Sequence, residues 1–176
     1  MKSHLIAVTF ALPLCLSDMA FAAGSGEEST PGKPHCKSGE VYDKKTNKCV
    51  AAREGALDTQ GFYENVRELA YAGRYDDAQH ILSLMPQDDD RTLTYLGFTS
   101  RKMGKTDTAM SYYAQALKAN PANILARSYM GQGFVEQGEM KQAMAQLRAI
   151  RSHGGSGTWA EASLRTAIST GQTFNY

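Results

Sequence analysis

Residues 96–121 read LGFTSRKMGKTDTAMSYYAQALKANP, and the order of small, aromatic and apolar residues in this stretch decides the fold. Gly104 lies between two segments whose apolar residues recur at helical spacing, so a left-handed turn residue is expected there. Gly97 and Ala109 lie where the two helices have to approach closely, and we expect them to face each other. The stretch therefore predicts a helix, a glycine turn and a second helix.

The glycine turn has counterparts upstream and downstream, at Gly73 and Gly138. The interval from Gly104 to Gly138 equals that from Ala109 to Ala143, whereas the interval from Gly73 to Gly104 is slightly shorter. It is shorter because Pro86 and the aspartates that follow it end a helix early. Three helix pairs are therefore expected. Stacking is required because a single pair cannot bury its own apolar face.

These units resemble the tetratricopeptide repeat, a helix pair of about 34 residues with a Leu-Gly pair, two aromatic positions, an Ala and a closing Pro. The second unit matches at Leu96, Gly97, Ala109, Tyr113, Ala116 and Pro121, and the third at Gly131, Phe134 and Ala143. The third unit lacks the proline, and the first lacks the glycine of the Leu-Gly pair. The resemblance covers roughly residues 59–153. It implies an all-α fold, a right-handed α-solenoid of about three helix pairs.

A capping helix is expected after the third pair. The glycine-rich residues 153–157 end that pair, and Thr158 and Glu161 have the spacing of a capping box. We therefore expect a seventh helix from about Trp159 to Ser169, with Trp159 as a packing plug; the alternative is that Trp159 serves as a platform for a ligand. The repeat array with this helix is expected to span residues 58–176.

The first 22 residues have the features of a secretory signal peptide. Lys2 supplies positive charge, an apolar run covers Leu5–Leu16, and small residues precede the bond after Ala22. A membrane anchor is the alternative, but this run covers only about 18 Å as a helix, against a hydrocarbon core of about 30 Å. We expect cleavage after Ala22, no stable membrane anchor, and a periplasmic or secreted protein.

Residues 23–34 are small, polar and rich in Pro and Gly, which indicates a flexible linker. Residues 35–50 follow with strand-favouring and turn-favouring residues, which predict a small hairpin. Cleavage of the signal peptide leaves Cys36 and Cys49 as an even pair in an oxidising space, where a disulfide is expected. A zinc site would need four ligands, and a redox-active pair would usually be Cys-x-x-Cys.

No catalytic or cofactor-binding constellation is recognisable in the sequence. Its histidines have no metal-ligand spacing, and no phosphate-binding loop is present. The formal net charge of +1 does not indicate a nucleic-acid surface. We therefore expect no metal, no cofactor and no enzymatic activity, although an enzyme of an unrecognised type remains an alternative.

The resemblance places the partner-binding groove on the first helix of each pair. The groove residues that we expect on this basis are Tyr63, Arg67, Tyr71, Arg91, Thr94, Phe98, Arg101, Lys102, Ser128 and Gln132. Exposed aromatics and arginines are typical of peptide-binding surfaces. The alternative is that Tyr63 and Phe98 pack against neighbouring helices and that the arginines are solvated. Some family members hold a carboxyl terminus with Lys and Asn residues, and that set is absent here.

The predicted function is that of an exported protein-protein interaction module, an adaptor or assembly factor that binds a polypeptide segment in its groove. An alternative is a ligand- or glycan-binding protein that acts through the disulfide hairpin. The sequence from Cys36 to Cys49 faintly resembles cysteine-bounded chitin-binding modules, although those modules contain more cysteines and aromatic residues.

Overall fold

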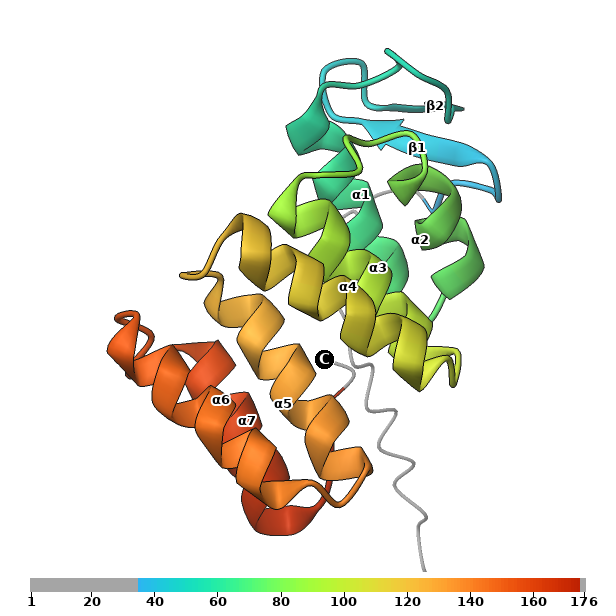
Figure 1. Cartoon of the computed structure of the whole chain (residues 1–176). Coiled ribbons are helices and arrows are strands. Elements are labelled where there is room, and N and C mark those ends of the chain that lie inside the picture. Colours follow the sequence, from blue (N-terminus) through green and yellow to red (C-terminus); the bar gives the residue numbers. More distant parts are fainter. Residues whose placement is uncertain (1–34, 175–176) are drawn as a thin grey trace, which may run out of the picture. The chain divides into compact units, whose positions relative to one another are not determined.

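The computed structural model describes residues 35–174, which form a two-stranded hairpin followed by seven helices (Figure 1). The expected signal peptide, residues 1–22, and the expected linker, residues 23–34, lie outside the described residues. The strands and helices are β1 (Glu40–Asp43), β2 (Lys48–Ala51), α1 (Thr59–Tyr71), α2 (Tyr75–Leu82), α3 (Asp90–Lys102), α4 (Thr106–Ala119), α5 (Ile124–Glu136), α6 (Met140–Ser152) and α7 (Trp159–Thr170).

The helices are arranged as three consecutive pairs, α1–α2, α3–α4 and α5–α6 (Figure 1). The first helices of the pairs, α1, α3 and α5, also contact one another in a row, and α7 packs against both α5 and α6. This arrangement confirms the predicted fold class, an α-solenoid of three helix pairs with a C-terminal capping helix, preceded by a disulfide-closed hairpin.

The turns within the three pairs are built alike. Gly104 has φ +77°, and its counterparts Gly73 and Gly138 both have φ +75°, a conformation that residues with a side chain rarely adopt. The next residue, Lys105, donates its N–H to the carbonyl of Ser100 at 2.9 Å, which satisfies a carbonyl at the end of α3. The glycines therefore set the geometry that repeats along the array.

Side-chain caps start the helices that follow the longer connections. Asp89 accepts hydrogen bonds from the backbone N–H groups of Arg91 and Thr92, at 2.9 and 3.0 Å, at the start of α3. At the start of α7, the hydroxyl of Thr158 accepts from the N–H of Glu161. The Glu161 carboxylate in turn accepts from the N–H of Gly157 at 2.8 Å, a bond that lowers the pKa of Glu161.

Two helical glycines mark the closest approaches between helices. A Cβ on Gly97 would lie 2.5 Å from the ring of Tyr113 in α4, and a Cβ on Gly131 would lie 2.6 Å from Leu164 in α7. The atoms nearest to Gly97 belong to Tyr113, which follows the expected partner Ala109 by one turn of α4. Each glycine leaves space that a large side chain of the neighbouring helix fills.

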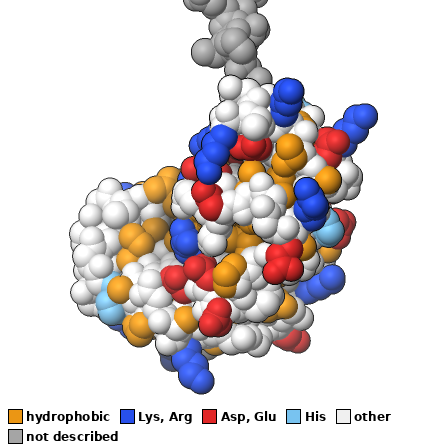
Figure 2. Space-filling model, turned by 90° about the horizontal axis from the view of Figure 1, so that it is seen from above, with side chains coloured by type: hydrophobic (Ala, Val, Ile, Leu, Met, Phe, Trp, Pro, Cys, Tyr) orange, Lys and Arg blue, Asp and Glu red, His pale blue; other side chains and the backbone are white. Residues whose placement is uncertain are grey.

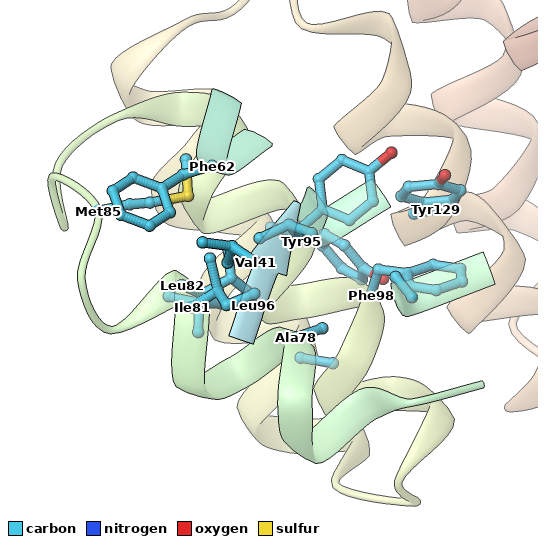
Figure 3. Packing of buried hydrophobic residues seen from close by; sticks show 14 residues of the cluster. Val41, Phe62, Ala78, Ile81, Leu82, Met85, Tyr95, Leu96, Phe98 and Tyr129 are labelled. Atoms are coloured by element: carbon cyan, nitrogen blue, oxygen red, sulfur yellow. The ribbon is translucent and has the colours of Figure 1, made fainter. Parts of the chain in front are cut away.

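The hairpin belongs to the same packed unit as the first two pairs. Val41 of β1 is fully buried and joins the cluster that contains Ile81 and Leu82 of α2 and Leu96 of α3 (Figure 3). Asn65 of α1 fixes the hairpin further. Its side chain accepts the N–H of Tyr42 at 2.7 Å and donates to the carbonyl of the same residue at 3.0 Å.

The predicted disulfide between Cys36 and Cys49 is present, with 5.5 Å between the two Cα atoms. It ties the segment before β1 to β2, which pairs antiparallel with β1. The carbonyl of Cys36 also accepts a hydrogen bond from Arg74 at 2.8 Å, so the bridged end of the hairpin contacts the turn between α1 and α2.

Reduction of the disulfide is expected to loosen the hairpin while leaving the helices formed. In the chain-entropy model a bridge over a loop of this size contributes about 3 kcal/mol. Val41 and Asn65 still hold the hairpin to α1 after reduction. The Cys36→Ser/Cys49→Ser variant should therefore keep its far-ultraviolet circular dichroism, while the amides of β1 and β2 exchange faster with deuterium. A large loss of helical signal would contradict this.

Candidate functional site

The first helices of the pairs, together with α7, form one side of the array, which we call the inner face. A hollow of about 500 Å³ opens on it, and its walls come from all four of these helices. We call it the inner hollow, and its lining residues are Tyr63, Arg67, Tyr71, Tyr95, Leu125 and Trp159. Stacking of the repeats thus brings residues from both ends of the array into one site.

Aromatic rings run across the inner face, with one ring from each of the four helices. The ring centroid of Tyr63 lies 5.6 Å from that of Tyr95, Tyr95 lies 6.3 Å from Tyr129, and Tyr129 lies 6.3 Å from Trp159. All three contacts are edge-to-face, the geometry that aromatic quadrupoles favour. Burial raises the pKa values of Tyr63 and Tyr95, so both phenols stay neutral at pH 7.

Two arginines edge this aromatic surface. The guanidinium of Arg67 is exposed and lies 5.9 Å from the ring centroid of Tyr63 and 5.7 Å from that of Tyr71. The guanidinium of Arg91 lies 5.0 Å from the Tyr63 ring and contacts Asp89 at 3.5 Å. A ligand with an apolar group and a carboxylate would therefore meet both aromatic rings and cations here.

A second, smaller hollow of about 320 Å³ adjoins the inner hollow, and the two share Tyr63, Tyr95 and Leu125. Its far wall is polar. Asn123 donates to the carboxylate of Asp90 at 2.7 Å and to the hydroxyl of Thr94 at 3.1 Å. The apolar and polar hollows together extend the inner face from α1 to the loop between α4 and α5.

Five of the ten expected groove residues line these two hollows, namely Tyr63, Arg67, Tyr71, Arg91 and Thr94. The other five lie farther along α3 and on α5. Of these, Phe98, Arg101, Ser128 and Gln132 are buried, and Lys102 is half-buried. The structure therefore does not bring all ten residues together on one open surface.

The expectation that Phe98 is exposed is wrong, because its side chain is 0% exposed. Its ring centroid lies 4.8 Å from that of Tyr129 and 6.1 Å from that of Tyr95 (Figure 3). The physical reason is the central place of α3, which contacts α1, α2, α4 and α5, so that every residue from Thr92 to Arg101 is buried. Of the two alternatives for Phe98, packing against neighbouring helices fits its position.

Of the two charged residues at the end of α3, Arg101 is held inside the protein and Lys102 is half-buried. Arg101 is 4% exposed, forms an ion pair with Glu136 of α5, and lies 5.9 Å from the Phe98 ring centroid. Burial lowers the pKa of Lys102 to about 8, and the neighbouring Arg101 charge adds to this effect. Lys102 is therefore only partly charged at slightly alkaline pH.

Trp159 does not plug the end of the stack as expected, because its side chain is 43% exposed and lines the inner hollow. Tyr95 and Leu125 also line the hollow and are absent from the expected groove set. A signal for them does exist in the sequence. The interval from Leu125 to Trp159 equals that from Tyr95 to Tyr129, and both equal the repeat interval between the glycine turns of the last two pairs. Leu125 and Trp159 therefore hold equivalent places in successive units, and so do Tyr95 and Tyr129.

No group of three or more His, Cys, Asp or Glu side chains between residues 35 and 174 could hold a metal ion. In that same range, no helix has the length and apolarity needed to cross a membrane. On the face shown in Figure 2, acidic and basic side chains are interspersed.

Comparison with known proteins agrees with this architecture. A family model described as tetratricopeptide repeat matches residues 100–162, which run from the end of α3 into α7. Residues 100–162 are therefore a tetratricopeptide-repeat region. The match covers the second helix of the middle repeat, the whole third repeat and the start of the capping helix. No curated protein matches the sequence.

Solved structures with a similar fold include type III secretion chaperones. One is the Yersinia enterocolitica translocator chaperone SycD in complex with a peptide of the translocator YopD. It has a TM-score of 0.53 and 20% identity, over 67% of this chain and 92% of that chain. Another is PcrH in complex with the chaperone binding region of PopB, with a TM-score of 0.52 and 17% identity, over 66% of this chain and 98% of that chain. At this identity the likeness concerns the repeat fold alone.

Proposed function

We propose that this repeat protein is a non-enzymatic adaptor or assembly factor that binds a segment of another polypeptide at the inner hollow. The observation that carries the proposal is the hollow itself, which combines Tyr63, Tyr95 and Trp159 with the exposed guanidinium of Arg67. Tyrosine, tryptophan and arginine are the residue types that contribute most to binding energy at protein interfaces.

The structural neighbours support the same kind of partner. SycD is seen with a peptide of YopD, and PcrH with the chaperone binding region of PopB. In our proposal the segment places an apolar side chain in the inner hollow and a carboxylate near Arg67 or Arg91. Tyr71 and Thr94 line the same surface. The buried Phe98, Arg101 and Ser128 support this surface from within the array.

We further propose that the protein acts in the periplasm or outside the cell, after cleavage of residues 1–22, with residues 23–34 as a linker. The apolar run Leu5–Leu16 and the small residues before Ala23 support export. The Cys36–Cys49 bridge also supports it, because disulfides form and persist in oxidising compartments.

Peptides selected from a phage-displayed library of random dodecamers on the wild-type protein test the proposed binding function. We expect selected peptides to bind Arg67→Ala and Trp159→Ala about thirtyfold more weakly than wild type, because truncation of a central interface anchor costs about 2 kcal/mol. Isothermal titration calorimetry measures the affinities. Thermal melting verifies that each variant keeps the stability of the wild type.

Matched controls lie on the helix at the opposite side of the third pair. Arg148 and Met144 of α6 are exposed, and neither lines the inner hollow. Arg148→Ala and Met144→Ala should therefore bind the selected peptides as wild type does. Failure to select any peptide, or equal losses in the control and hollow variants, would refute the proposed function.

A further inference from the structure

The residues that follow α7 also contact the helical array. Gly171, with φ +74°, closes α7, and the following residues return to the inner face of α5. There the N–H of Phe174 donates to the side-chain oxygen of Gln132 at 3.0 Å. The hydroxyl of Thr173 donates to Glu136 at 2.6 Å. A short non-helical segment, residues 172–174, is therefore held by two side chains of α5.

Gln132 is fixed in the orientation that this contact needs. Its side chain is fully buried, and its amide nitrogen donates to Ser163 of α7 at 3.0 Å and to Ser128 at 3.4 Å. These bonds turn the amide oxygen toward Phe174. A buried carbonyl oxygen without a donor is costly, so this oxygen requires a donor such as a main-chain N–H.

The position of this contact within the repeats links it to the inner face. Gln132 is the counterpart of Phe98 one repeat earlier, and Glu136 is the counterpart of Lys102. In the first unit the corresponding positions are Arg67 and Tyr71, which line the inner hollow. Residues 172–174 thus lie on the face that is the proposed partner surface, toward the carboxyl end of α5.

We propose that Gln132 and Glu136 form a recognition site for the main chain of a non-helical polypeptide, and that residues 172–174 occupy this site in cis. Glu136 contributes an acceptor that Arg101 holds in place. A tethered segment has a high effective concentration, so it excludes a free peptide of equal intrinsic affinity. A partner polypeptide that binds along the whole inner face has to displace residues 172–174. This displacement by a partner rests on the proposed function.

The test uses the full chain and a probe made from its own sequence, a peptide of residues 168–174 with an acetylated start and an amidated end. Phe174→Pro removes the N–H that Gln132 accepts, whereas Phe174→Ala removes the ring and keeps the N–H. Loss of one such hydrogen bond corresponds to roughly a fivefold change in an equilibrium. We therefore expect Phe174→Pro to bind the probe roughly fivefold more tightly than wild type, and Phe174→Ala to stay close to wild type.

The side-chain amide resonances of Gln132 in nuclear magnetic resonance spectra give a second readout. They should shift in Phe174→Pro and return toward the wild-type position when the probe is added. Equal probe binding by all three proteins, absence of binding to Phe174→Pro, or unchanged Gln132 resonances would each overturn the proposal. Probe binding without any peptide from the random library would refute the partner function and leave the site at Gln132 in place.

Discussion

Gly97→Ala is expected to lower the free energy of unfolding by about 1–3 kcal/mol, although alanine is the better helix former. The added Cβ would lie 2.5 Å from Cε1 and 2.7 Å from Cδ1 of Tyr113, whose side chain is fully buried. Because the ring is fully enclosed, it has little space into which it can move aside. Gly97→Leu should lower the free energy of unfolding further than Gly97→Ala does. Urea unfolding followed by circular dichroism measures the change.

Gly133→Ala provides a matched control within an inner-face helix. The new Cβ would meet the sulfur of Met110 at 3.2 Å and Cδ of Arg101 at 3.3 Å, both parts of long side chains. The gain in helix propensity, about 1 kcal/mol, should then offset the milder crowding. If Gly97→Ala were as stable as Gly133→Ala, the packing of α3 on α4 described above would be incorrect.

Glu136→Gln is expected to destabilise the protein by about 3 kcal/mol, because it leaves the charge of Arg101 buried and uncompensated. The side chain of Arg101 is 1% exposed, whereas that of Glu136 is 36% exposed. Arg101→Met removes the other partner and leaves a carboxylate that water can reach, so it should lower the free energy of unfolding by less. Urea unfolding of both single variants and of the double variant measures this asymmetry.

Two further comparisons isolate the ion pair. The double variant Arg101→Met/Glu136→Gln should be more stable than the sum of the single changes predicts, because the two residues interact directly. Thr173→Val removes the other hydrogen bond to Glu136 and should have a much smaller effect. A cost for Arg101→Met that equals or exceeds that of Glu136→Gln would mean that the guanidinium reaches solvent.

The repeat pattern was enough to predict the architecture, because each helix pair depends on local signals. Gly104 adopts a left-handed conformation, Thr158 and Glu161 begin α7, and Cys36 is bonded to Cys49. These signals act over a few residues, or over one repeat, so periodicity in the sequence reveals them. The prediction of about three helix pairs with a capping helix is confirmed for that reason.

The candidate site was less predictable because it depends on how the pairs surround one another. The resemblance placed Phe98 in the groove on the first helix of its pair, but neither the resemblance nor helical spacing shows how far neighbouring helices cover that helix. The return of residues 172–174 to Gln132 was not predicted either. No periodic pattern marks these residues, and the contact joins positions 42 residues apart.

The aromatic row across the inner face also makes the site optically visible. Trp159 is the only tryptophan among the 176 residues, and it lies at the end of this row, partly open to solvent. The Tyr129 ring is 6.3 Å away, close enough for excitation of the tyrosines to pass to the indole. The tryptophan fluorescence of the unmodified protein therefore originates at the inner hollow and reports on its polarity.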